Sequence, residues 1–298
     1  MGRDKSSLAK MGETMNRGRS TRLQWAFSIA GEPPMSNAPR EFPVGWGNDV
    51  LSGFQLVAMG NELATFVHEP RWQGLLSAIA TALNECAESI LKILEGDLSP
   101  GPLFFMSAHN QYLAAARLAL SGHCAGAFPT GRAAVEFALY GWRLSTDVEA
   151  MTRWHEKPEE KAERRKWGRE FSFGELAQAL ASRDENLAGW AKHLHEAAID
   201  FGSHPNASGL YAGVEQAVDE ERGAISSQIS YLHGMDGFSL WTMKFVAEVG
   251  ICVLSFFCLT YGARADALGL PSKVMSLKFE LGALRAPNHD SKNGKAGR

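Results

Sequence analysis

Cysteine is scarce in this sequence, and no two of its four cysteines have the C-x-x-C spacing typical of a metal or redox motif. Each cysteine stands among apolar or small residues, and no secretory signal precedes them. We therefore expect reduced thiols in the core of a cytoplasmic protein, without a disulfide framework. The four residues are Cys86, Cys124, Cys252 and Cys258.

An excess of charge of one sign is also missing. The 30 lysines and arginines stand against 33 aspartates and glutamates, which gives a formal net charge of -3. The chain thus has no overall basic field that would recruit nucleic acid, and any contact with nucleic acid must be local. A composition that is 45% hydrophobic and 21% charged is sufficient for a sizeable core.

The alternating pattern of β-strands is almost absent. Residues 224–234 alone combine β-branched residues with rough alternation, so we expect at most one short β-hairpin. Elsewhere the apolar residues recur at helical spacing, and the glycines of "SGHCAG" permit a tight turn that forms an antiparallel helical hairpin. The sequence predicts an all-α fold, a single multi-helix bundle with helices over residues 51–67, 72–94, 103–120, 125–144, 174–180, 185–200 and 238–269.

The longest hydrophobic run, residues 245–262, has about the length of a short membrane span. Glu248 interrupts it, and a charge is costly on a lone helix that faces lipid. The amphipathic helices also need a central partner that is apolar all round, so we expect a central bundle helix and no membrane contact. The bundle domain is predicted over residues 49–284, between a disordered or loosely attached arm, residues 1–48, and a polar tail, residues 285–298.

Three charged side chains interrupt otherwise apolar helices. Arg132 and Glu136 stand four residues apart in "GRAAVEFALY", on one helix face, and Arg117 stands in "YLAAARLALSGH". Such charges are rarely buried unless they are paired. Two interpretations stay open: a buried structural network that fixes the register of the helices, or an arginine-lined pocket for a phosphate or carboxylate.

The stretch "IDFGSHPNAS" contains a candidate metal site. A continuous helix would place four ligands for a divalent ion on one face: His193, Glu196, Asp200 and His204. However, Gly202 and Pro205 disfavour helical backbone there, which leaves His204 in a loop. We group His204 and Asn206 with the Arg132–Glu136 pair as a candidate polar pocket, and we expect no metal ion or other cofactor.

Residues 103–270 resemble a bacterial all-helical family of the HEPN-like kind. The resemblance depends on "YLAAARLALSGH", on "RAAVEFALYGW" with its arginine and glutamate, on "FGSHPN" and on the apolar closing helix. HEPN-like ribonucleases use an arginine to steady the scissile phosphate and a histidine a few residues later as general acid or base. The resemblance implies Arg117 and His123 as catalytic residues, although Leu118 occupies the place of the polar residue expected after the arginine.

We therefore expect a cytoplasmic helical interaction or regulatory protein, associated with RNA or with a defence system by analogy with the family. Its partner would be a protein or an RNA, and a homodimer is a further expectation. Two enzymatic alternatives stay open. One is a metal-independent ribonuclease that uses Arg117 and His123, and the other is a metal-dependent hydrolase at His193, Glu196, Asp200 and His204.

Overall fold

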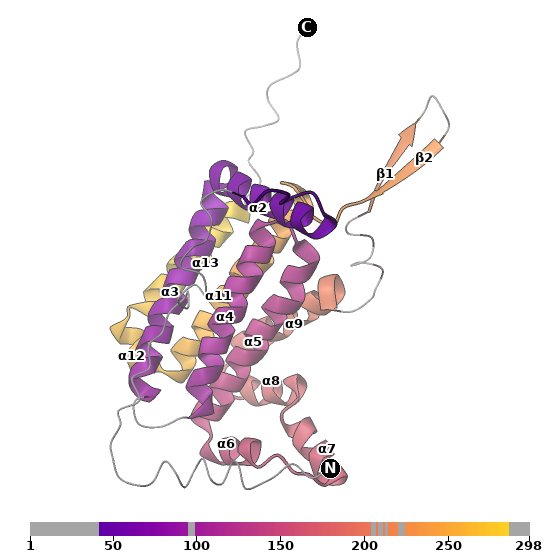
Figure 1. Ribbon diagram of the computed structural model, residues 1–298. Helices are drawn as coiled ribbons and strands as arrows, with labels where there is room; N and C mark the ends of the chain where they lie inside the picture. The colour runs from indigo at the N-terminus through magenta and orange to yellow at the C-terminus, as the bar shows by residue number, and fades with distance from the viewer. Residues whose placement is uncertain are drawn as a thin grey trace.

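The computed structural model describes residues 42–94, 99–203, 207, 211, 214–219 and 224–285. Within these ranges the chain forms eleven α-helices, one π-helical turn and one two-stranded antiparallel sheet (Figure 1). The prediction of an all-α bundle with at most one short hairpin is confirmed. Most of the predicted arm and almost all of the predicted tail lie outside the described residues.

Three helices form the centre of the bundle: α4 (Pro100–Leu120), α5 (Cys124–Thr146) and α11 (Gly237–Thr260). Between α4 and α5, Gly122 has a φ of +79°, a conformation that glycine adopts without strain, and the chain reverses into the predicted antiparallel hairpin. At the start of α11 the Asp236 carboxylate accepts a hydrogen bond of 2.7 Å from the backbone N–H of Ser239, as part of a capping box.

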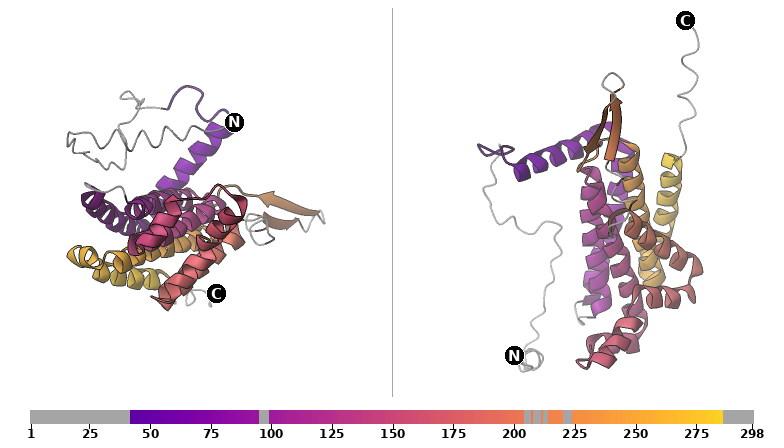
Figure 2. Two further views of the ribbon diagram at one scale, coloured as in Figure 1. Left: turned by 90° about the horizontal axis from the view of Figure 1, so that it is seen from below. Right: turned by 90° about the vertical axis from the view of Figure 1, so that its right-hand side faces the viewer.

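α11 is covered on every side. Besides α4 and α5, it packs against α3 (Pro70–Leu94) and α13 (Leu270–Arg285) (Figures 1 and 2). By length and composition, α11 and α2 (Val50–His68) are the two described helices that could each cross a membrane. Because 72% of the hydrophobic window of α11 is buried inside the protein, the prediction that α11 is the central bundle helix is confirmed.

At Gly250, α11 passes very close to α3 and α4. A Cβ atom added to Gly250 would lie 2.5 Å from Cε2 of Tyr112 and would also overlap the side chain of Ile79. Tyr112 is fully buried, and its hydroxyl donates a 2.8 Å hydrogen bond to the carbonyl oxygen of Leu76. The short distance between helix axes therefore requires glycine here, although the backbone conformation is ordinary.

The prediction of a single closing helix over residues 238–269 is wrong. The chain instead forms α11, then the short helix α12 (Gly262–Ala267), then α13. Gly269, with a φ of +63°, ends α12, and Pro271 follows in the first turn of α13. Glycine after a helix and proline at the start of the next are the usual residues at such boundaries, so "GLP" separates α12 from α13 where the predicted helix ends. The break that the prediction missed follows Thr260, where Tyr261 leaves the helical conformation with a φ of -123° and a ψ of 47°.

Four shorter helices form a branch on one side of α5, in the lower half of Figure 1. Aspartate or serine side chains cap three of them by accepting backbone N–H bonds: Asp147, Ser172 and Asp184. These caps satisfy N–H groups that have no partner within a helix. The branch consists of α6 (Val148–His155), α7 (Lys161–Glu170), α8 (Phe173–Ala181) and α9 (Glu185–Ala198).

α9 continues into a π-helical turn, η1 (Ile199–Ser203), which packs on α5. A Cβ atom on Gly202 would lie 2.6 Å from the carbonyl oxygen of Ala125, so the glycine of "IDFGSHPNAS" allows the end of α9 to approach α5 closely. Helical backbone extends through Ser203, so the expectation that Gly202 disfavours it is wrong. The next predicted site residues, His204 and Asn206, lie outside the described residues.

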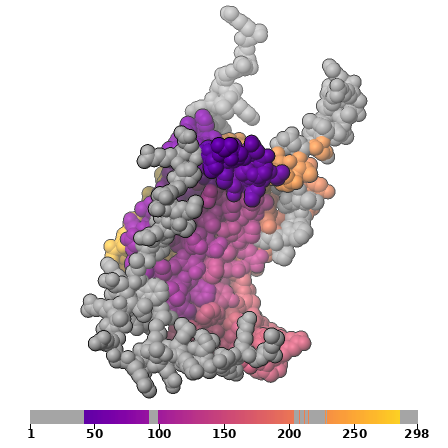
Figure 3. Space-filling model, in the orientation of Figure 1, coloured from indigo at the N-terminus to yellow at the C-terminus, as the bar shows by residue number. Residues whose placement is uncertain are grey.

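α2 lies across one end of the bundle, at the top of Figure 1. It contacts α3 and α4, and within α2 only Ser52 and Thr65 are buried. The space-filling view shows α2 in indigo on the surface (Figure 3). Beyond the same end projects the antiparallel hairpin of β1 (Val214–Asp219) and β2 (Ala224–Ile229). Of its two strands, β2 lies in the predicted segment, residues 224–234, and β1 precedes that segment.

Substitution of Gly250 tests the close helix contact. Gly250→Ala should lower the free energy of unfolding by about 1–3 kcal/mol, because the methyl group overpacks the contact with Tyr112 and Ile79. The matched control is Gly282→Ala on α13, where an added Cβ atom meets nothing within 4 Å. That variant should gain about 0.5–1 kcal/mol from helix propensity alone. Urea unfolding of both variants measures the difference, and equal effects would contradict the overpacking.

A second prediction concerns His109 on α4, which is 2% exposed. Burial lowers the pKa of His109 to about 4, whereas the unfolded chain takes up this proton near the ordinary pKa of 6.5. The free energy of unfolding should therefore fall as the pH decreases from 6.5 towards 4, by up to about 1.4 kcal/mol per pH unit from this group. His109→Gln should show a flatter dependence in the same window, and an unchanged slope would contradict the assignment.

Candidate functional site

One carboxylate joins two helices at the side of the bundle. Glu136 and Arg132 lie one turn apart on α5, and Arg132 Nε donates a 2.7 Å hydrogen bond to Glu136 Oε1. From α9, His195 Nε2 lies 3.0 Å from the same oxygen atom. The predicted pairing of Arg132 with Glu136 is therefore present, and a histidine from a separate helix completes a three-residue cluster.

This cluster lies at the edge of the core. The side chains of Arg132 and Glu136 are 28% and 36% exposed, so the expectation of a deeply buried network is wrong. Burial alone would raise the pKa of Glu136, but the hydrogen bonds from His195 and Arg132 outweigh this effect and hold the pKa below its ordinary value. Glu136 is therefore an ionised carboxylate at neutral pH.

Beside the cluster, a groove of about 480 Å³ runs between α8 and α9. The rings of Phe173 and His195 stack face to face on its floor, with centroids 3.7 Å apart and planes 12° from parallel. We call it the α8/α9 groove. It is lined by Phe173, Gly174, Ala177, Gln178, Ala181, Glu185, Ala188, Gly189, Lys192, His195, Glu196 and Ile199.

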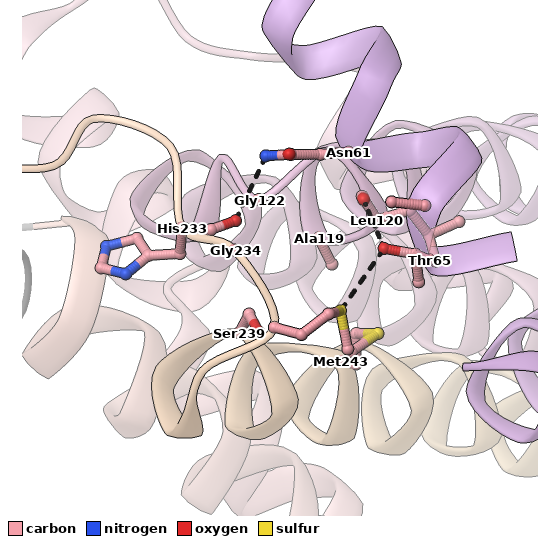
Figure 4. Close-up of a pocket in the computed structure, with 11 residues that line it drawn as sticks. Asn61, Thr65, Ala119, Leu120, Gly122, His233, Gly234, Ser239 and Met243 are labelled. Atoms are coloured by element: carbon pink, nitrogen blue, oxygen red, sulfur yellow. Dashed lines mark hydrogen bonds between the residues drawn. The ribbon is translucent and has the colours of Figure 1, made fainter. Parts of the chain in front are cut away.

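A second cavity lies beside the N-terminal end of α5, below α2 (Figure 4). Asn61 Nδ2 donates to the carbonyl oxygens of Ser121, at 3.0 Å, and His233, at 3.3 Å. Thr65 Oγ1 donates to the carbonyl oxygen of Leu120, at 3.2 Å. The cavity has a volume of about 100 Å³, whereas sites for small-molecule ligands usually occupy about 300 Å³ or more.

The predicted catalytic pair lies close to this small cavity. Arg117 has a side chain that is 75% exposed, and its Nε donates a 3.1 Å hydrogen bond to Glu62 Oε1 on α2. It does not join the cluster around Glu136. His123 immediately precedes α5, and its ring meets the edge of Phe54 on α2 at a centroid distance of 5.7 Å. The arginine thus has a carboxylate partner where a phosphate would have to bind.

Three of the four candidate metal ligands lie in the part of the chain that the structure describes. Among the described residues, no group of three or more histidine, cysteine, aspartate or glutamate side chains could hold a metal ion. His193, Glu196 and Asp200 are described, and His204 is not. The three that the structure describes therefore supply no such group by themselves.

His195 is the site residue that sequence reasoning missed. The buried residues of α9 recur at helical spacing and include His195: Leu187, Ala188, Ala191, Leu194, His195 and Ala198. This pattern places His195 on the inner face of α9, and the neighbouring His193 outside it. Helical periodicity therefore identifies the inward histidine, but its partner Glu136 lies 59 residues away and depends on the tertiary fold.

Comparison of this chain with protein-family models, with curated proteins and with solved structures found no match. The Glu136 cluster and the α8/α9 groove are therefore interpreted from their own geometry.

The partial exposure of the cluster leads to a prediction for Glu136→Gln. Because solvent screens the ion pair, the variant should lose about 1 kcal/mol of stability at neutral pH, not the 3–5 kcal/mol typical of a deeply buried pair. The pKa of Glu136 is lowered in the folded state, so its contribution is complete above the ordinary value of 4.5 and disappears as the pH falls through the folded value. The free energies of unfolding of the wild type and the variant should therefore become equal in acid.

Chemical unfolding at neutral and acidic pH measures this difference. Glu163→Gln is a suitable control, because Glu163 forms a 2.7 Å ion pair with Lys166 on the exposed surface of α7. It should change stability by a few tenths of a kcal/mol at most. A loss of several kcal/mol in Glu136→Gln, or a difference that persists in acid, would show that the cluster behaves as a buried network.

Proposed function

We propose that this chain is a cytoplasmic helical interaction protein that binds an amphipathic helix of a partner protein in the α8/α9 groove. The observation that carries the proposal is the groove of about 480 Å³ between two helices, with glycine or alanine at five of its twelve lining positions. A third helix placed there would pack as a helix packs in a bundle, with its axis about 8–10 Å from each neighbour.

Small residues line both walls of the groove, and the space in front of them is open. On α8, Gly174, Ala177 and Ala181 follow one another at intervals of three and four residues along one side. On α9 the small residues are Ala188 and Gly189. A Cβ atom added to Gly174 or Gly189 would meet nothing within 4 Å, so neither wall is filled by another part of the described chain. Large apolar side chains of a partner helix would fill this space.

The rim of the groove is polar, and its buried lining residues are Ala177, Ala188 and His195. Lys192 Nζ lies 3.9 Å from Glu196 Oε1, and both side chains are well exposed. On the floor, the stacked rings of Phe173 and His195 are held in place by the bond to Glu136. An apolar centre surrounded by a polar rim is the usual arrangement of a protein interface.

The HEPN-like resemblance supports a role for this chain in a bacterial system that acts on RNA or in defence. We therefore propose that the partner helix belongs to a protein of such a system. The ribonuclease alternative has weaker geometric support. Arg117 is engaged by Glu62, and the neighbouring cavity of about 100 Å³ is smaller than a nucleotide site requires. Metal-free cleavage of RNA that disappears in His123→Ala, with the fold intact, would favour the enzyme instead.

The interaction is tested by selecting displayed helical peptides against the full chain. We expect the enriched peptides to place large apolar residues at i, i+3 or i+4, and i+7, because this spacing forms one helix face. Gly189→Leu should weaken their binding at least tenfold, since the leucine side chain occupies the groove. Fluorescence anisotropy of labelled peptides measures the affinity.

Gly282→Leu is the matched control for this experiment. Gly282 is an exposed helical glycine with no atom within 4 Å of an added Cβ, as is Gly189, but it lies on α13. Both variants should remain folded, because leucine favours helix more than glycine does. Peptides that bind both variants equally, or that show no helical spacing, would contradict the proposal.

A further inference from the structure

Among the described residues, the outer face of α2 is apolar and mostly exposed, although Leu56 lies beside Gly47 of the preceding segment. Its exposed large side chains include Leu56, Leu63, Phe66 and Val67. The right-hand view of Figure 2 shows the N-terminal end of α2 extending beyond the rest of the bundle. Monomeric soluble proteins rarely leave a continuous apolar patch of this kind free, so the face requires an occupant.

Four residues on this face form a regular stripe: Leu56, Gly60, Leu63 and Val67, at intervals of four, three and four. At about 100° per residue they fall within an arc of about 60° on the helix surface. We call them the α2 stripe. Gly60 lies next to the midpoint of α2, and a Cβ atom added there would meet nothing within 4 Å. Alternating intervals of four and three are typical of helices that pair along a seam.

We propose that the α2 stripe pairs with the α2 stripe of a second copy of this chain. A two-fold axis near Gly60 would bring the two helices into close approach at the glycine. It would also set Leu56 of one copy against Leu63 of the other, and the reverse. Such an interface is self-complementary, as two-fold symmetry requires. The inference does not depend on the α8/α9 groove.

The charges of α2 favour a second copy over a membrane surface. Glu62 is the one acidic residue of α2, and it is bonded to Arg117 on α4, so two copies would not bring unpaired carboxylates together. α2 also has no lysine or arginine, the residues that attract interfacial helices to anionic lipid headgroups. The stripe is therefore uncharged, and an identical uncharged stripe is a suitable partner.

The available area is consistent with a weak, specific dimer. The exposed parts of Leu56, Leu63, Phe66 and Val67 amount to roughly 400 Å² of apolar surface per copy, given free side-chain areas of about 150–200 Å². Two copies together would bury about 800 Å² of apolar surface, or about 1,200 Å² with a polar rim. This value lies at the lower end of stable interfaces, so we expect the dimer to dissociate on dilution.

Sedimentation velocity of the full chain over a range of concentrations tests the dimer. Leu63→Glu places a charge in the α2 stripe and should raise the dissociation constant at least tenfold. Leu51→Glu is the matched control, because Leu51 and Leu63 are 66% and 68% exposed but point in different directions around α2. Leu51→Glu should dimerise as the wild type does.

Cysteine cross-linking tests the position of the two-fold axis. Under oxidation Gly60→Cys should form a disulfide between two copies, because such a bond requires Cα atoms about 4.4–6.8 Å apart. Gln55→Cys, at an exposed position on a different side of α2, should not. The native chain is the background control, since Cys86, Cys124 and Cys252 are buried and Cys258 is half-buried.

Three outcomes would overturn the inference. The first is a native chain that stays monomeric at every concentration, and the second is a Leu63→Glu variant that dimerises as the native chain does. The third is a monomer that binds vesicles of phosphatidylcholine and phosphatidylglycerol through α2, with binding lost in Leu63→Glu, which would make the membrane the occupant. None of these outcomes affects peptide binding in the α8/α9 groove, so the two proposals fail separately.

Discussion

The close contact of α11 with α3 and α4 at Gly250 is the constraint on which the rest of the structure depends. α11 is apolar nearly all round, and a helix of this kind is stable in water only when other elements cover its whole circumference. Its neighbours provide that cover, and the missing side chain at Gly250 lets them approach closely enough to exclude water. A second close approach, of Gly131 on α5 to Phe245 and Val249, brings α5 against the same helix.

α9 is attached to this centre at two levels. Near its middle, His195 is bonded to Glu136 on α5. At its end, Phe201 lies against Trp241 of α11, with ring centroids 4.1 Å apart, and Trp241 lies 4.9 Å from Phe128. α8 then packs on α9 through the ring of Phe173. Both walls of the α8/α9 groove are thus held on the bundle, because α8 also packs on α5 and buries Leu176 and Leu180 in the core.

The sequence patterns predicted the features that helical geometry alone determines. The apolar run around Glu248 identified the central helix, and the interval between Arg132 and Glu136 identified their pairing, because helical geometry fixes both. The partners of Arg117 and His195 are Glu62 and Glu136, which lie 55 and 59 residues away in sequence. Periodicity contains no information about such distant contacts. The exposure of α2 also escaped prediction, since a helix with apolar residues around most of its circumference resembles a buried one.

The attachment of α2 has a consequence for how the molecule gains its stability. Hydrogen bonds from the side chains of Asn61 and Thr65 to backbone carbonyl oxygens help to hold this helix on the bundle, and little of its apolar surface is buried there (Figure 4). Segments with few buried apolar contacts open at a much lower free energy than the core does. Pairing of the α2 stripe would add apolar contacts to a helix in which only Ser52 and Thr65 are buried. By mass action, the stability of α2 would then rise with the concentration of the chain itself.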